Sequence, residues 1–558
     1  MFCIIVSPNS TATARNMQLA LRYLQRRLPR RPCVRVVDQN VITVTAPEEL
    51  SLSRGERGES LLMHGPYRIR SCARTEIFPN AASIDRIAHA NPNHHIVWSS
   101  VKRRTVFVRC ARVGFRPLYY HRTRDGITLI SSHLIFQRLL AGPLSPDPVG
   151  MMQQLGASAC TGTRTLLQRV SRIPAETVLQ MTDSDYSEHC FSASDGDYDV
   201  PTSEANEERL LGIAQKVVRD TVPEKDLCVA LSGGFDSRFL LFTSLLARKQ
   251  AFAITLGHPG WLDVDLAKAL TSALGIPHVI TAPKPSSTVA QVRYILDEVE
   301  HLSDYLSPIW LSEFRTALIQ TSLPVLNGFF GGPLTGGLSS PSCDPSTTSP
   351  SAVSRWLREV NKCSIRWSLL RRVCRVPVTP IRRMVGKHAS ALVHLAEGSI
   401  RALEFNYRQR GFVYLNTGNL YSLYCNVRTP FADLRLRALF DGLTSRDLRQ
   451  QALYRRVLKI LDTTGVPVAS TTSRMYRPET FTSGPREFLF QSYRRLRPAI
   501  QDMIASTREQ LDDFFDVDQL LVITNAARRD PLRGVPAFTE ALLLVNAALW
   551  WLYARETP

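Results

Sequence analysis

Hydrophobic and polar positions follow different patterns in the two parts of this chain. Up to about residue 190, short apolar runs rich in β-branched and aromatic residues alternate with turns, which is typical of a layered β-rich domain. Such runs lie at 42–44, 96–98, 106–108 and 127–130. From Leu210 onward, apolar residues recur at helical spacing. The pattern therefore predicts a β-rich first part and a second part that contains helices.

The second part begins with alternating strand-like and helix-like segments. An apolar run at 227–231 has strand length, and the residues from Phe239 onward have helical spacing. Further strands are expected at 251–256 and 278–281, with a helix at about 264–274 between them. This alternation predicts a parallel sheet with crossover helices, whose ligands bind at the carboxyl ends of the strands.

Two polar stretches mark the predicted boundaries. Residues 182–207 are polar and acidic, and we expect a linker at 191–207. Residues 339–354 are rich in Ser, Pro and Thr and are expected to form a mobile loop. The predicted fold is therefore α/β, with a β-rich α+β domain at 1–190, the linker, and a parallel-sheet domain at 208–558 that becomes helical towards its end.

Composition places the chain among ordinary globular proteins. It has 558 residues, of which 44% are hydrophobic and 21% charged, so it can form two or three domains with cores of their own. The first residues lack the basic region and cleavage site of a signal peptide. The longest apolar stretch, 541–554, is shorter than a bilayer requires and contains Asn546. We therefore expect a cytoplasmic protein with no membrane partner.

Charge and cysteine spacing narrow the expected partners. The formal net charge is +19, with arginines concentrated between Arg355 and Arg383, and such a field favours anionic partners. A solvated helical face is the alternative explanation. No aromatic-interleaved recognition motif accompanies the charge, so nucleic acid is not an expected partner. The 11 cysteines include no Cys-x-x-Cys pair, which argues against zinc, iron–sulfur and disulfide sites.

The most informative stretch is the polar hexapeptide Ser-Gly-Gly-Phe-Asp-Ser at 232–237, between the strand at 227–231 and the following helix. Two glycines allow a tight turn whose N–H groups can approach an anion, and the helix N-terminus adds unpaired donors. Ser232 and Ser237 add hydroxyl donors, and Asp236 can hold the magnesium that accompanies a polyphosphate. The lysine of a Walker A loop is missing. The stretch therefore predicts a polyphosphate site of another kind.

This hexapeptide resembles the pyrophosphate-binding loop of the N-type ATP pyrophosphatases, which cleave ATP to AMP and pyrophosphate while adenylating a substrate. Further segments are similar to motifs of the asparagine synthetase family and follow the order of that family. They lie at 114–120, 131–133, 173–176, 327–332 and 428–433. The first, Gly-Phe-Arg-Pro-Leu-Tyr-Tyr, is similar to Gly-x-Lys-Pro-Leu-Tyr-Tyr of the family's amidotransferase domain. The resemblance covers most of the chain.

The resemblance implies a fold and a site for each part. Residues 1–190 are expected to form an Ntn-hydrolase-like glutamine amidotransferase domain, and 208–558 an adenine-nucleotide α-hydrolase-like ATP pyrophosphatase domain. ATP and Mg²⁺ are the implied cofactors. Asp236 is expected to hold the metal and to act in catalysis. The implied nucleotide contacts are Leu231, Ser232, Gly233, Gly234, Asp236, Ser237, Leu256 and Gly328.

The first departure from the family concerns glutamine hydrolysis. Glutamine-hydrolysing members need an N-terminal cysteine, whose thiol attacks the amide with help from its own α-amine. Here Cys3 follows Met1 and Phe2, and Phe2 is too bulky for ready removal of Met1. We therefore expect Cys3 to be a core residue of the first strand, and the domain to be degenerate, without glutaminase chemistry.

Two further departures concern the nucleotide half. Gly332 stands where the family has an aspartate that shares the magnesium, so the metal would rest on Asp236, phosphate oxygens and water. The family's late catalytic lysine has no obvious counterpart, and Arg474 and Arg477 are the nearest cations, taken here as the candidate catalytic ones.

An acidic residue is also expected after the second strand of the parallel sheet. Asp263 or Asp265 stands where the family has this residue. A role as a helix N-cap explains Asp263 equally well.

The leading hypothesis for function is an ATP-dependent ligase. Family members without the glutaminase cysteine include the β-lactam synthetases and the lasso-peptide macrolactam cyclases. By resemblance, this chain would adenylate a carboxylate, in a small molecule or a precursor peptide, and couple it to an amine. Macrolactam formation in a lasso-type peptide is the specific case, with a maturation protease as a further partner.

Two alternatives stay open at this point. One is asparagine synthase-type amidation of a small molecule or a polysaccharide component. The other is a catalytically impaired pseudoenzyme that keeps the fold. Gly332 and the absent lysine favour the pseudoenzyme, whereas the intact Ser-Gly-Gly-x-Asp-Ser pattern favours the enzyme.

Overall fold

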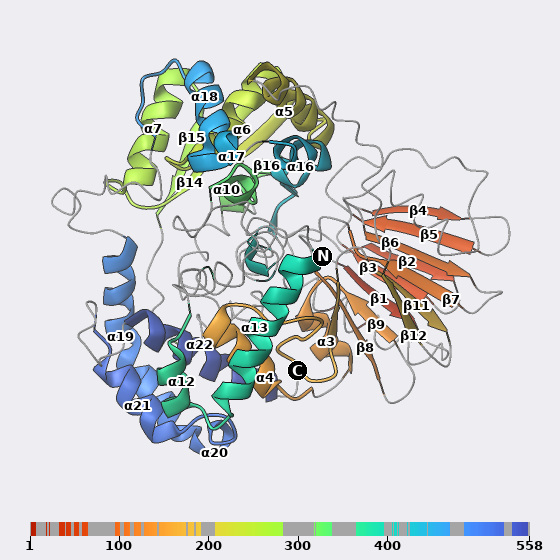
Figure 1. Ribbon diagram of the computed structural model, residues 1–558, viewed down its shortest axis with the longest axis vertical. Helices are drawn as coiled ribbons and strands as arrows, with labels where there is room; N and C mark the ends of the chain where they lie inside the picture. The colour runs from red at the N-terminus through yellow and green to blue at the C-terminus, as the bar shows by residue number, and fades with distance from the viewer. Residues whose placement is uncertain are drawn as a thin grey trace.

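The chain has a mixed α/β architecture with three recognisable parts. The computed structural model describes residues 95–182, 207–282, 321–337, 364–395, 424–468, 485–528 and 538–555, with short gaps inside these ranges, and a few strands and single residues elsewhere. Figure 1 shows two sheets on the right, a parallel-sheet part at the top and a helical part below.

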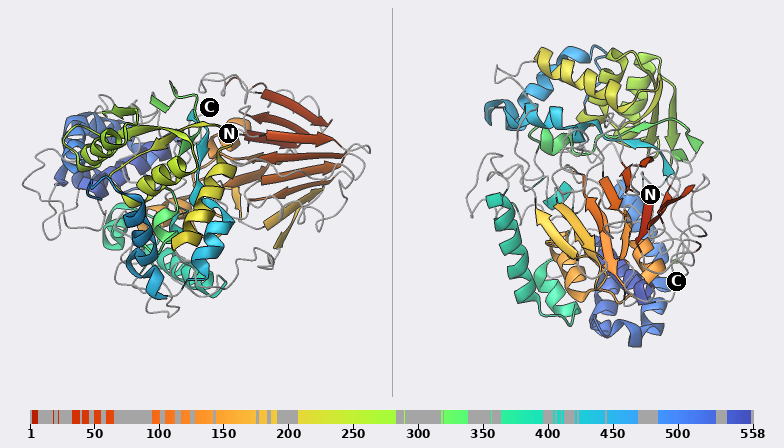
Figure 2. Two further views of the ribbon diagram at one scale, coloured as in Figure 1. Left: turned by 90° about the horizontal axis from the view of Figure 1, so that it is seen from above. Right: turned by 90° about the vertical axis from the view of Figure 1, so that its right-hand side faces the viewer.

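Two antiparallel sheets pack face to face beside the helical parts (Figure 2). Their strands are β1 (Phe2–Val6), β2 (Cys33–Asp38), β3 (Val41–Thr45), β4 (Leu50–Arg54), β5 (Glu59–His64), β6 (His95–Ser100), β7 (Thr105–Arg109), β8 (Leu118–Arg122), β9 (Thr128–Ser131), β10 (Ser171–Ile173), β11 (Thr177–Thr182) and β12 (Tyr186–Cys190). The strand orders are β10-β8-β9-β1-β3-β2 and β12-β11-β7-β6-β5-β4. Val97, Val108 and Leu179 of the second sheet share a core with Leu118 and Ile130 of the first.

This sandwich confirms the strands expected in the first part of the chain. The four predicted runs fall in β3, β6, β7 and β9. The acidic stretch 182–207 differs from a plain linker, because its beginning forms β12, which pairs antiparallel with β11. A polar sequence is tolerated there because β12 is an edge strand. Residues 191–206 and the loop expected at 339–354 lie outside the described residues.

The helical part shares one core with α4 (Pro148–Ala157), which follows α3 (Leu134–Ala141) in the first part of the chain. Trp367 would come within 2.4 Å of a Cβ added to Gly156, and the Ile365 N–H donates to the Leu155 carbonyl at 2.7 Å. The helices are α12 (Trp367–Val373), α13 (Val378–Leu395), α19 (Pro485–Ser506), α20 (Arg508–Leu511), α21 (Val517–Ala526) and α22 (Phe538–Arg555). The apolar stretch 541–554 is thus a core helix, as expected. None of the helices that the structure describes combines the length and apolar character of a membrane span.

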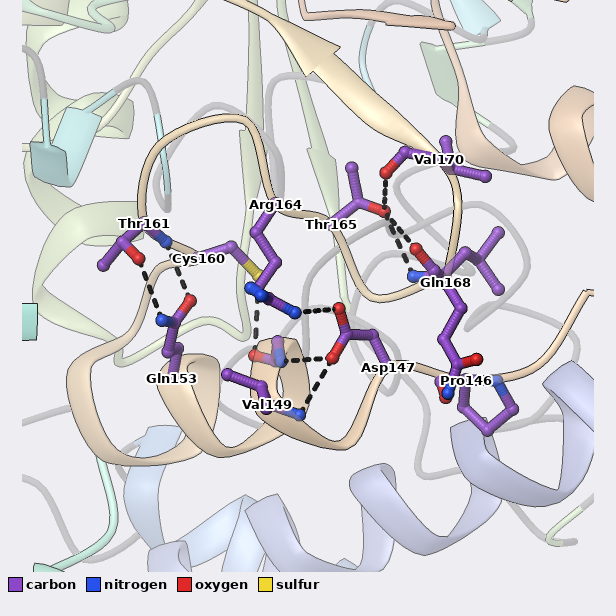
Figure 3. A network of polar contacts seen from close by, with 12 residues as sticks. Pro146, Asp147, Val149, Gln153, Cys160, Thr161, Arg164, Thr165, Gln168 and Val170 are labelled. Carbon is purple, nitrogen blue, oxygen red and sulfur yellow. Dashed lines mark hydrogen bonds and ion pairs between the residues drawn. The ribbon is translucent and has the colours of Figure 1, made fainter. Parts of the chain in front are cut away.

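A network of polar contacts fixes the segment after α4 to that helix (Figure 3). Asp147 caps α4, accepting from the Val149 and Gly150 N–H groups at 2.9 and 3.1 Å, and also pairs with Arg164. Gln153 of α4 exchanges two hydrogen bonds with Thr161, at 2.8 and 3.0 Å. These contacts give the chain that returns to β10 a defined path over α4.

The parallel sheet has the strand order β15-β14-β13-β16-β17, with every pairing parallel. Its strands are β13 (Asp226–Ala230), β14 (Gln250–Leu256), β15 (His278–Thr281), β16 (Val325–Leu326) and β17 (Val427–Arg428). The helices of this part are α5 (Glu207–Thr221), α6 (Phe235–Leu246), α7 (Leu262–Leu274), α10 (Gly331–Leu334), η3 (Pro430–Ala432), α16 (Leu434–Asp441), α17 (Ser445–Leu448), η4 (Arg449–Gln451) and α18 (Ala452–Leu461). The strands and the helix expected between 227 and 281 are confirmed in β13, β14, α7 and β15.

One histidine at the contact between α13 and the segment after α4 predicts a pH-dependent stability. His388 Nε2 accepts from the Gly162 N–H at 3.3 Å, and burial together with nearby Arg172 lowers the pKa of His388 to about 4. Since the folded-state pKa lies below the ordinary 6.5, the unfolded chain takes up the proton first, and stability is lost as the pH falls through 6.5.

We expect His388 to lower the free energy of unfolding by about 1 kcal/mol at about pH 5.5 relative to about pH 7.5. Urea unfolding at the two pH values measures the difference. His388→Gln keeps an acceptor for Gly162 but cannot be protonated, so it should reduce the difference by that amount. An unchanged difference in the variant would contradict the prediction.

Candidate functional site

The Ser-Gly-Gly-Phe-Asp-Ser loop lies at the reversal point of the parallel sheet. It follows β13, which pairs with β14 on one side and with β16 on the other. The chain runs outward from β13 in one direction through β14 and β15 and then resumes on the opposite side. Ligands of open parallel sheets bind in the crevice outside the strand ends at such a switch point. The fold therefore places the loop at the position that favours ligand binding.

The two serines of the loop hold its own backbone. Ser237 Oγ accepts from the Ser232 N–H at 3.0 Å and lies 3.1 Å from Ser232 Oγ. Ser232 Oγ in turn accepts from the Gly234 N–H at 3.2 Å. The sequence suggested hydroxyl donors for an anion, but here the hydroxyls shape the turn and start α6. The N-cap residue of α6 is Gly234, and no side chain of the described residues caps this helix.

The remaining glycine of the loop donates to a carboxylate. The Gly233 N–H bonds to Asp263 Oδ1 at 3.1 Å. The N-cap position of α7 is Trp261, so the N-cap explanation for Asp263 is wrong, because the helix starts two residues earlier than that role needs. Asp265 accepts from the Gly260 N–H at 3.0 Å instead. A loop N–H thus already binds an anionic oxygen, supplied by the chain itself.

Asp236 sits in a cradle of glycines after β16. A Cβ on Gly331 would lie 2.5 Å from Asp236 Cγ, and one on Gly328 would lie 2.8 Å from Asp236 Cβ. The Tyr454 hydroxyl donates to Asp236 Oδ1 at 3.2 Å, and the Gly332 N–H also bonds to this carboxylate. The surrounding protein raises the pKa of Asp236 to about 7, because the loss of water outweighs these two bonds, which act in the opposite direction.

Gly332 itself lies beside this carboxylate. A Cβ at Gly332 would be 3.9 Å from Asp236 Oδ2, so a second acidic side chain there would have faced Asp236 directly. Among the residues described, no group of three or more His, Cys, Asp and Glu side chains is arranged to hold a metal ion. The site therefore offers one carboxylate in the cradle.

Of the other predicted site residues, the structure describes Leu231, Leu256 and Gly328 but not the two arginines. Leu231 is 3% exposed and belongs to the core. Its N–H donates to the Ile254 carbonyl at 2.9 Å and its carbonyl accepts from Thr255 Oγ1 at 2.8 Å, so its backbone is bonded to β14, the strand that ends at Leu256. Gly328 lies against Asp236, as its cradle role requires. Arg474 and Arg477 lie outside the described residues.

Two residues beside the cradle, Asn327 and Phe330, were not among the predicted site residues. Asn327 is 3% exposed at the end of β16; its Oδ1 accepts from the Phe329 N–H at 3.2 Å and from Thr429 Oγ1 at 3.3 Å. Its Nδ2 has no hydrogen-bond partner in the described part of the chain. Phe330 has φ 69°, in the left-handed region that glycine prefers. The only available signal was that both flank the glycines of the segment 327–332.

A substitution in the cradle tests how closely the backbone packs on Asp236. Gly331→Ala forces either the carboxylate or the loop to move, and we expect a loss of about 1–3 kcal/mol in unfolding free energy. Gly212→Ala in α5 is the control, since nothing lies within 4 Å of a Cβ there, and it should gain up to about 1 kcal/mol from helix propensity. Denaturant unfolding of both variants gives the comparison. Equal stability in the two would show that the cradle is loose.

Comparisons with known proteins leave the family open. No protein-family model matches the chain, and no curated protein matches it in sequence. Among solved structures, the chain is similar to a glutamine phosphoribosylpyrophosphate (PRPP) amidotransferase from B. subtilis complexed with ADP and GMP. The match has 10% identity and a TM-score of 0.23, and covers 59% of this chain and 81% of that one. A likeness this weak supports no statement about this chain.

Proposed function

We propose that this protein is an ATP-dependent amide-forming synthetase of the asparagine synthetase type. It would adenylate a carboxylate, releasing pyrophosphate, and pass the activated group to an amine, releasing AMP. The observation that carries the proposal is the Ser232–Ser237 loop at the switch point of the parallel sheet, with Asp236 held in a glycine cradle.

The residues present suit a metal–polyphosphate group. Asp236 is the carboxylate that would hold Mg²⁺, and a metal of this kind needs few protein ligands because it keeps waters and phosphate oxygens. Within the described part of the chain the start of α6 has no capping side chain, so its first-turn N–H groups could donate to an anion. The glycines at 328 and 331 let the backbone approach Asp236 closely. ATP would supply the activating group, and these residues would bind and orient it.

The first sheet supports a reaction without glutamine hydrolysis. Cys3 lies inside β1, where it pairs with Val44 of β3 on one side and Ser131 of β9 on the other. An internal strand residue has no α-amine to serve as the base of an N-terminal nucleophile. The amine would therefore come from the substrate, as in macrolactam formation within a peptide, or from free ammonia, as in amidation of a small molecule or polysaccharide component.

A pseudoenzyme is the second candidate, and two observations favour it. The Gly233 N–H is bonded to Asp263, and Gly332 offers no second carboxylate. A protein of this kind would keep the fold but bind nucleotide weakly or without need for metal.

Binding of a non-hydrolysable ATP analogue separates the two candidates. We expect calorimetric binding that depends on magnesium and is reduced at least about tenfold by Asp236→Ala, because the variant removes the cradle carboxylate. Asp502→Ala, an exposed aspartate of α19, is the matched control and should bind like the unsubstituted chain. Release of AMP and pyrophosphate with a carboxylate substrate would then be sought. Binding of the analogue that is unchanged both without magnesium and in Asp236→Ala would refute the proposed synthetase function.

A charge change at Asp263 tests the contact with the loop. Asp263→Asn keeps an oxygen acceptor for the Gly233 N–H but removes the negative charge beside the loop. We expect the metal-free ATP analogue to bind several-fold more tightly to this variant, since like charges near an anion site are unfavourable. Weaker binding would show instead that the carboxylate organises the loop for the ligand.

A further inference from the structure

Helix α18 contacts the candidate site through its own first turn and the residue before it. Gln450 and Gln451, which precede α18, have φ values of 54° and 61°, a left-handed conformation that non-glycine residues adopt at a cost. Gln451 Nε2 donates to Thr335 Oγ1 at 2.6 Å, and Thr335 directly follows the short helix α10, which begins at the cradle glycine Gly331. The unusual turn thus sets the starting point of α18 against the cradle.

Tyr454 has a fully fixed position on α18. It is 0% exposed, and its ring lies 4.9 Å from the ring of Phe239 and 6.2 Å from that of Phe431, centroid to centroid. The hydroxyl reaches Asp236 Oδ1 at 3.2 Å, with the Phe235 carbonyl 3.5 Å away. A ring packed on two sides leaves the hydroxyl little freedom, so it holds one carboxylate oxygen in place.

The far end of α18 is attached to the same turn of α6. Arg238 is 0% exposed; its Nη1 donates to Asp462 Oδ2 at 2.5 Å and to the Val466 carbonyl at 2.6 Å, and its Nη2 to the Pro467 carbonyl at 2.8 Å. A buried arginine with three acceptors resists displacement, since breaking such a group leaves charges unpaired. Helix α18 is therefore tied to the first turn of α6 at both of its ends.

We propose that Tyr454 is the positioning residue of the cradle, acting through Asp236. By holding Oδ1, and with the glycine backbone on the other side, it sets the rotation of the carboxylate that would face a metal–polyphosphate group. This inference rests on the proposed nucleotide site, and it deepens that proposal by naming a residue that the sequence pattern did not predict. By fixing the orientation of Asp236, the Tyr454 hydroxyl would offset the lack of a second carboxylate among the described cradle residues.

Tyr454→Phe tests the role, because it removes one oxygen and keeps the packed ring. We expect magnesium-dependent binding of the non-hydrolysable ATP analogue to weaken about tenfold, the usual scale for a hydrogen bond to a charged group. Metal-free binding of the analogue should be unchanged. Tyr493→Phe is the matched control, a buried tyrosine that donates to the Thr524 carbonyl among the C-terminal helices, and it should leave both affinities unchanged.

A double-mutant cycle with Asp236→Asn separates positioning from simple support of the fold. If Tyr454 acts through Asp236, Tyr454→Phe should cause no further loss of magnesium-dependent binding in the Asp236→Asn background. Equal losses in both backgrounds would overturn the proposal and leave Tyr454 a structural residue. Full metal-dependent binding by Tyr454→Phe would also overturn it while the proposed function stands, whereas no binding by the unsubstituted chain would refute both.

Discussion

The close approach of the backbone to the Asp236 carboxylate is the constraint on which the candidate site of the parallel sheet depends. The 2.5 Å and 2.8 Å distances from the positions of absent Cβ atoms at Gly331 and Gly328 mean that a side chain at either position would displace Asp236 or the backbone. The loop after β13, the segment after β16 and helix α18 must therefore meet at one carboxylate. The Tyr454 hydroxyl, which would otherwise be buried without a partner, finds its acceptor in this carboxylate.

The sequence predicted this end of the molecule well because its signals are local. The strands at 251–256 and 278–281 and the helix between them follow from apolar spacing over a few residues, and their order implies a parallel sheet. The loop at 232–237 was placed correctly because glycine and short polar residues between a strand and a helix have few other uses.

Contacts between distant residues could not be read in this way. The partner of Gly233 is Asp263, 30 residues away, and the partner of Asp236 is Tyr454, 218 residues away. No pattern of spacing links residues that far apart in the sequence. Tyr454 also fits an ordinary buried position of helix α18 equally well, so its role could not be predicted. Strand β12 was missed for another reason, because an edge strand needs only one neighbour and so tolerates a polar sequence.

The core shared by α4 and the C-terminal helices has a consequence for how the protein is made. Met151, Met152 and Leu155 of α4 belong to one buried core with residues such as Leu544 and Trp551, which come far later in the sequence. The first part of the chain therefore emerges from the ribosome well before the later helices that complete the cover of α4. During translation the apolar face of α4 is therefore transiently exposed. Such exposure favours aggregation, so the order of synthesis itself affects how safely this chain folds.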